Sequence, residues 1–166
     1  MHKMNRYMVH RLLARMTDYV ERQSGLSSRY LEYIGNGKNR YEVEHIWANH
    51  AEDHTDEFSH SNDFAEFRNR IGGLLLLPKS FNASYGDLPY GGKLEHYYSQ
   101  NLLAQSLHWR SYEHNPGFLR FIENSKLPFR AHEQFKKADL DARQALYSEL
   151  AEQVWSAERL REILGS

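Results

Sequence analysis

The residue types best suited to catalysis stand side by side in one short alternating segment, where Glu44 is followed directly by His45. A neutral imidazole is a competent general base near neutral pH. A carboxylate such as Glu44 and an amide such as Asn82 offer the hard oxygen ligands that Mg²⁺ takes together with substrate phosphate. These residues predict a hydrolytic phosphodiester site, in which a divalent metal stabilises phosphoryl charge while His45 deprotonates water. From spacing alone, a histidine at the end of a strand is more often a surface or packed residue.

Two short segments predict a pair of β-strands around these residues. Residues 41–47 alternate in polarity and are rich in β-forming residues, so Val43 is expected on one face and Glu44 on the other. Residues 74–77 are four consecutive leucines that end at Pro78, which predicts a compact apolar strand. We expect the two strands to form a minimal β-hairpin.

The segments that follow the two strands differ in character. Residues 48–62 are polar and acidic without periodicity, which predicts a long loop, and loops of this length are uncommon unless they are functional. Residues 79–84 are expected to form the first turns of a helix that carries Asn82. A strand pair followed by a helix can bring His45 and Asn82 to one point, although they are 37 residues apart in the chain.

The rest of the chain is predicted to be helical. Residues 5–23 place an apolar side chain at every fourth position, which is typical of an amphipathic helix. Further helices are expected over residues 29–34, from 62 or 63 to 70, over 89–101, from 115 to 122, and from 139 to 154 with a restart at 156 towards 164. The fold class is therefore mostly α with a small β-hairpin, an α+β chain.

The composition of the 166 residues bounds the class of protein. With 40% apolar and 26% charged residues, the chain can bury the core of one domain. It has no cysteine, which excludes disulfides, thiolate zinc sites and cysteine nucleophiles. The longest apolar run is residues 74–77, far short of the roughly 20 residues of a membrane-spanning helix, and the N-terminus has no signal-peptide core. We expect a cytoplasmic protein that does not contact membranes.

A net charge of only −1 hides a strong segregation of charge along the chain. Residues 1–41 carry a net charge of +5, residues 42–67 carry −8 with four histidines, residues 68–137 carry +5, and residues 138–166 carry −3. An acidic, histidine-rich insert between basic segments suits a cation site beside a polyanion-binding surface. An exposed acidic loop with ordinary basic faces elsewhere is the simpler interpretation, and charge alone favours it.

Two other sets of residues have more than one interpretation. His50 and His54 are four residues apart, which on a helix would suit a zinc site, but a solvated loop is simpler because the segment has no helical apolar face. Basic residues also flank the strands and the helix after them, and they are candidates for phosphate contacts or ordinary surface charge. These residues are Arg68, Arg70, Lys79 and Lys93.

Three stretches of the sequence match a known pattern, and they are residues 42–46, residues 70–77 and Asn82. Together they resemble the C-terminal nuclease domain of GmrSD-type modification-dependent restriction and anti-phage defence proteins. The resemblance covers residues 41–106 and implies an HNH, or His-Me finger, DNA endonuclease with a ββα-metal core embedded in a helical bundle. It also implies a bacterial protein that is longer than this chain, with an N-terminal ParB-like nucleotide-hydrolysing sensor domain.

The resemblance assigns roles residue by residue. It makes His45 the general base that activates water, and Glu44 takes the place of the acidic metal ligand before that histidine. Asn82 takes the place of the third motif residue, which completes a Mg²⁺ (or Mn²⁺) site. A lysine that recurs downstream in the family is matched by Lys93 and implies a phosphate contact. The expected substrate-binding residues are Arg70, Lys79 and Lys93. The flanks, residues 1–40 and 107–166, are expected to be helical parts of the same nuclease domain.

Two positions depart from the family pattern. Gly73 stands where the family has the central asparagine of the HNH motif, and Ala48 stands where it has a proline. The missing asparagine braces the loop that carries the base, and Asn69 or Asn62 are the candidates to replace it. We favour an active nuclease. The alternative is a catalytically degenerate helical module that binds DNA or protein and retains the nuclease fold.

Overall fold

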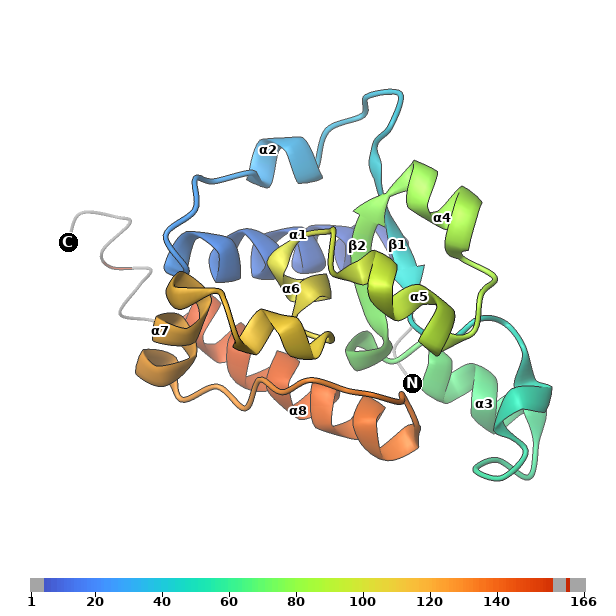
Figure 1. Cartoon of the computed structure of the whole chain (residues 1–166). Coiled ribbons are helices and arrows are strands. Elements are labelled where there is room, and N and C mark those ends of the chain that lie inside the picture. Colours follow the sequence, from blue (N-terminus) through green and yellow to red (C-terminus); the bar gives the residue numbers. More distant parts are fainter. Residues whose placement is uncertain (1–4, 157–160, 162–166) are drawn as a thin grey trace.

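A computed structural model of the chain describes residues 5–156 and residue 161. In this part of the chain, eight α-helices surround a two-stranded sheet (Figure 1). The helices are α1 (Arg6–Gln23), α2 (Tyr30–Tyr33), α3 (Ser61–Arg68), α4 (Lys79–Tyr85), α5 (Tyr90–Tyr97), α6 (Leu102–Gln105), α7 (Pro116–Ser125) and α8 (Lys137–Val154). The strands are β1 (Tyr41–His45) and β2 (Leu74–Pro78), and 3₁₀ turns cover Ala51–His54, Ile71–Gly73 and Trp109–Tyr112. The expected fold class, mostly α with a small β-hairpin, is confirmed.

The two strands pair antiparallel, with Tyr41 opposite Pro78 and His45 opposite Leu74. All four leucines of β2 are buried. A strand that is covered on both faces reads as a continuous apolar run instead of an alternating one. The leucine run therefore marks the centre of the molecule, and β1 is held against it.

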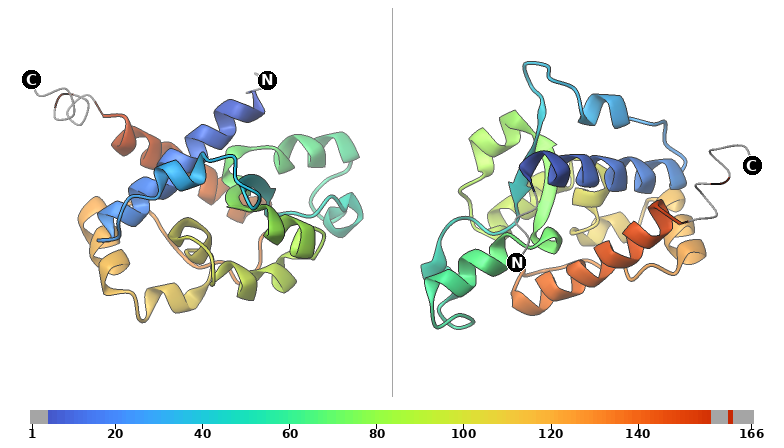
Figure 2. Two further views of the ribbon diagram at one scale, coloured as in Figure 1. Left: turned by 90° about the horizontal axis from the view of Figure 1, so that it is seen from above. Right: turned by 180° about the vertical axis from the view of Figure 1, so that it is seen from behind.

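Successive side chains of the hairpin enter two different hydrophobic clusters. On one face, they pack with α1, α6, α7 and α8; on the other, they pack with residues of α3, α4, α5 and α8. Val43 lies on the first face and Glu44 is buried on the second, as the alternation of β1 predicts. Figure 2 shows α1 crossing one side of the hairpin, with α4 and α5 on the other side.

Close packing fixes the chain on both sides of β2. Before the strand, Gly72 touches α8 so closely that a Cβ would lie 2.5 Å from the backbone nitrogen of Gln144. After the strand, α4 begins at once and packs against both strands. Asn101, the residue before α6, donates from Nδ2 to the backbone oxygen of Leu76 at 2.7 Å. The strand that pairs with β1 is therefore tied to three helices.

Some helix boundaries differ from the sequence predictions. The residue before α3 is His60, so this helix begins ahead of the predicted asparagine and aspartate. The predicted helix over residues 89–101 ends at Tyr97, because Asn101 caps a separate helix, α6, by accepting a hydrogen bond from Ala104 at 3.1 Å.

The C-terminal helix also begins earlier than predicted. Asp139 lies in the first turn of α8, where its Oδ2 accepts a hydrogen bond from the backbone nitrogen of Lys136 at 3.0 Å, and not at the cap position. The predicted helical restart from 156 to 164 lies outside the described residues. Over residues 5–156 and 161, no helix combines the length and the hydropathy needed to cross a bilayer.

Candidate active site

The centre of the candidate site is a buried ion pair between β1 and α5. Nζ of Lys93 donates hydrogen bonds to Oε1 of Glu44 at 2.6 Å and to the backbone oxygen of His45 at 2.9 Å. The side chain of Lys93 is 0% exposed and that of Glu44 is 6% exposed. Burial raises the pKa of Glu44 and lowers the pKa of Lys93, while the attraction between the two opposes both shifts. In the protein interior, each of these two charges is neutralised by the other.

The imidazole of His45, at the end of β1, is oriented by a single amide. Nε2 of His45 lies 3.0 Å from Oδ1 of Asn69, and Nδ2 of Asn69 donates to the backbone oxygen of Ala65 at 2.7 Å. Because the side-chain nitrogen of Asn69 donates to the carbonyl of Ala65, its side-chain oxygen faces the imidazole. An amide oxygen can only accept, so we assign the proton of the ring to Nε2 of His45. A neutral His45 then carries its lone pair on Nδ1, where it can accept a proton.

The surroundings keep His45 neutral at pH 7. Burial lowers its pKa to about 4, the positive charges of Arg68, Lys93 and Arg6 act in the same direction, and the hydrogen bond with Asn69 opposes them. Arg68 is held in place by a hydrogen bond from its Nε to the backbone oxygen of Trp47 at 3.0 Å. An imidazole that is neutral at pH 7 has a lone pair with which it can accept a proton from water.

Asn82, on α4, has an unsatisfied acceptor. Its Oδ1 is buried and accepts no hydrogen bond from any residue that the structure describes. Buried polar atoms are normally paired, so this oxygen requires a donor or a cation. The Lys93 hydrogen bond engages only one of the two oxygens of Glu44, Oε1. Oε2 of Glu44 and Oδ1 of Asn82 are oxygen atoms of the type that Mg²⁺ and Mn²⁺ bind together with water and phosphate.

The predicted substrate-binding residues near the hairpin have different environments. Lys93 is fully buried against Glu44, which leaves its ammonium no surface for a phosphate in this arrangement. The guanidinium of Arg70 lies 3.5 Å from the ring centroid of Phe67 and 3.4 Å from Oδ1 of Asp141. We therefore assign Lys93 to positioning Glu44, and Arg70 already has an anionic partner within the protein.

Lys79 lies at the other end of the hairpin. It is exposed at the start of α4, and its backbone nitrogen donates to the backbone oxygen of Arg40 at 2.9 Å. The strand register puts this end opposite to the end that carries His45. The structure therefore places the Glu44–Lys93 pair at the His45 end of the strands and Lys79 at the opposite end.

Two histidines of the acidic insert, His50 and His54, contact carboxylates. The contacts are His50 with Glu52 at 3.1 Å and with Asp87 at 3.0 Å, and His54 with Glu57 at 3.2 Å. The two histidines do not share a helix face, because only the 3₁₀ turn Ala51–His54 is helical here. Over the described ranges, no group of three or more His, Cys, Asp or Glu residues could hold a metal. These contacts favour the solvated-loop interpretation over the zinc site.

The departure at Gly73 has a packing reason. A Cβ at this position would lie 3.2 Å from Cδ1 of Leu140, a tight contact, so any larger residue here would require that leucine of α8 to move by a few tenths of an ångström. Asn69 reaches His45 from the end of α3 instead. The sequence left both Asn69 and Asn62 as candidates to replace the missing asparagine. The contact with His45 favours Asn69.

One comparison with known proteins gives a match. The family model described as "GmrSD restriction endonucleases, C-terminal domain" matches residues 3–150. The matched range includes α1 and most of α8, and therefore extends well beyond the motif region on both sides. No curated protein and no solved structure gives a significant match.

Proposed function

Since the chain belongs to the C-terminal domain family of the GmrSD restriction endonucleases, we propose that it is a metal-dependent HNH endonuclease that hydrolyses DNA phosphodiester bonds. The observation that carries this proposal is the pair formed by His45 and Asn69. The pair leaves Nδ1 of a neutral imidazole as the nitrogen that can accept a proton. The preceding residue of β1, Glu44, and the buried amide oxygen of Asn82 on α4 are the oxygen ligands that we propose for a divalent metal.

In the proposed reaction, Nδ1 of His45 takes a proton from water while the water oxygen attacks phosphorus. The bond from phosphorus to the leaving sugar oxygen breaks, and that oxygen takes up a proton from solvent. Asn69 holds the ring throughout, and its hydrogen bond strengthens as the ring becomes positively charged. Arg68 adds positive charge near the phosphoryl oxygens as negative charge builds up on them.

Glu44 and Asn82 would hold Mg²⁺ or Mn²⁺, which supplies positive charge to the phosphoryl and leaving oxygens. Lys93 fixes Glu44 and, through the backbone oxygen of His45, the end of β1. One buried side chain therefore positions both the metal ligand and the base.

DNA is the proposed partner, in bacterial restriction and defence against phage. We place the chain in a longer protein, next to a ParB-like nucleotide-hydrolysing domain that senses the target. Such a domain would contribute DNA contacts of its own, which is compatible with a net charge of only −1 over these 166 residues.

Plasmid nicking with Mg²⁺, with Mn²⁺ and with chelator tests the proposal. His45→Ala should lower the cleavage rate by roughly 10²- to 10⁴-fold, the usual contribution of a general base. His114→Ala is the matched control, because this histidine is 84% exposed on a distant segment, and it should cleave like wild type. Activity of His45→Ala within a few-fold of wild type would contradict the assignment of the base. A wild-type chain that binds DNA and cleaves with neither metal would support the degenerate binding module.

A further inference from the structure

A basic groove of about 370 Å³ lies between the first turns of α1 and the segment that leads into β1. The helix side contributes Arg6, His10 and Arg11, and the strand side contributes Arg40. Among the described residues that line the groove, the only carboxylate is Glu42, and Arg40 pairs with it at 2.9 Å. The lining therefore has a net positive charge.

Two of the arginines have no anionic partner within the described protein. Arg6 is exposed and forms no ion pair with any residue of the described ranges. Arg11 lies 4.8 Å from the ring centroid of the exposed Tyr7, and no described carboxylate pairs with it. Guanidinium groups at the wall of an open groove are suited to bidentate recognition of phosphate.

The groove points towards the base. Tyr41 and Val43 line it, and His45 follows on the same face of β1, about 7 Å further along the strand. A ligand that lies along the groove therefore arrives at His45.

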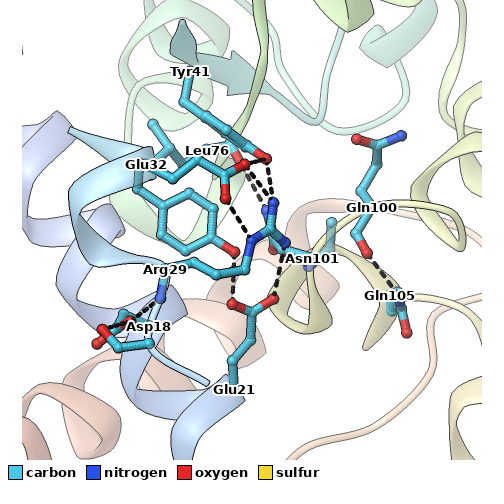
Figure 3. A network of polar contacts seen from close by, with 12 residues as sticks. Asp18, Glu21, Arg29, Glu32, Tyr41, Leu76, Gln100, Asn101 and Gln105 are labelled. Atoms are coloured by element: carbon cyan, nitrogen blue, oxygen red, sulfur yellow. Dashed lines mark hydrogen bonds and ion pairs between the residues drawn. The ribbon is translucent and has the colours of Figure 1, made fainter. Parts of the chain in front are cut away.

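A network of polar contacts holds the strand side of the groove against α1. Arg29 donates from Nη2 to the hydroxyl of Tyr41 at 2.8 Å and pairs with Glu32 at 2.6 Å (Figure 3). Its backbone nitrogen donates to Oδ1 of Asp18 at 2.8 Å, and its guanidinium lies 3.7 Å from the buried Glu21. Because Asp18 and Glu21 belong to α1, both walls are fixed relative to each other before any ligand binds.

We propose that this groove binds the sugar–phosphate backbone of the strand to be cleaved, with phosphates on Arg6 and Arg11, and leads the scissile phosphate to His45. This inference rests on the proposed nuclease function. The four residue steps from Tyr41 to His45 span about 13 Å along β1, the distance that the bound strand has to follow to reach the base. Contacts of this kind position the strand without selecting its sequence.

The test is an anisotropy titration of the full chain with labelled duplex DNA, in the His45→Ala background so that the DNA stays intact. Arg6→Gln/Arg11→Gln removes the groove charges. Arg15→Gln/Arg22→Gln is the matched control, since both residues are exposed on the same helix outside the groove. Loss of two phosphate contacts should reduce the slope of log affinity against log salt by about 1.8, at about 0.9 per contact, and the control should leave the slope nearly unchanged. Thermal melting should show that both double variants are folded.

The outcomes separate the groove from the nuclease function. Equal slopes for the two double variants would overturn the groove, while plasmid cleavage by wild type would continue to support the nuclease. Arg6→Gln/Arg11→Gln should also be tested for plasmid cleavage in a chain that retains His45. Cleavage at the wild-type rate would also overturn the groove. If the His45→Ala chain bound no DNA at low salt and wild type did not cleave, the proposed function would fail, and the groove with it.

Discussion

Replacement of Lys93 by methionine removes the cation of the buried ion pair. Methionine is similar in length and suits apolar surroundings, so the main change is the loss of charge and of two hydrogen bonds. Glu44, with a side chain 6% exposed, is left as a buried carboxylate without its partner. Removing one partner of a buried ion pair typically destabilises a protein by about 3–5 kcal/mol. We expect Lys93→Met to lower the free energy of unfolding by about this amount.

Urea denaturation followed by tryptophan fluorescence measures the effect, because Trp47 is 3% exposed and reports on this side of the core. With a urea dependence of about 2 kcal/mol per molar, the loss corresponds to a fall of about 1.5–2.5 M in the midpoint. Lys38→Met is the control, since Lys38 is exposed, and its midpoint should change by no more than about 0.25 M.

The double variant Lys93→Met/Glu44→Gln tests whether the loss of stability comes from leaving Glu44 as an unpaired charge. Removing both charges leaves no unpaired ion, so the double variant should be more stable than Lys93→Met alone. A fall of less than about 0.5 M for Lys93→Met would refute the reasoning. The same holds if the double variant loses as much stability as the two single variants added together.

Two further predictions concern Asn69 and His132. Asn69→Ala removes the hydrogen bond that holds the base, so the plasmid cleavage rate should fall by about 5- to 10-fold, from a bond of about 1–1.4 kcal/mol. Asn69→Asp keeps the acceptor and should stay within a few-fold of wild type at pH 7, whereas equal losses for the two variants would contradict the role of Oδ1. Burial lowers the pKa of His132, so the unfolded chain binds a proton more readily, and the stability that this residue contributes is present above pH 6.5 and falls below it. Between pH 7.5 and 5.5 the loss should be at most about 1.4 kcal/mol, and His132→Gln should remove it from the pH dependence of the melting temperature; an unchanged pH dependence would show that other groups cause it.

The sequence by itself determined those features that depend on neighbouring residues. A helix was predicted to start at residue 115, and Asn115 caps α7 by accepting a hydrogen bond from the backbone nitrogen of Phe118 at 3.2 Å. The fourfold spacing of apolar residues located α1 with its start one residue too early, and the leucine run located the buried strand β2. Capping, periodicity and turn geometry act over a few residues, which is why a single sequence is enough to predict them. The position of Glu44 and His45 at the end of a strand follows from the same local signals.

Only the tertiary structure decided which partners these residues have. The ammonium of Lys93 was expected on a phosphate, but it lies on Glu44, 49 residues away, because α5 packs over the second face of the hairpin. Asn69 contacts His45 across 24 residues, since the end of α3 returns to the end of β1. Arg6 lines one groove with Tyr41 and Val43 because α1 crosses the hairpin, although no motif includes it. A side chain's partner is set by how distant elements bury their apolar faces, and the free energy of that burial exceeds any preference encoded in the local sequence.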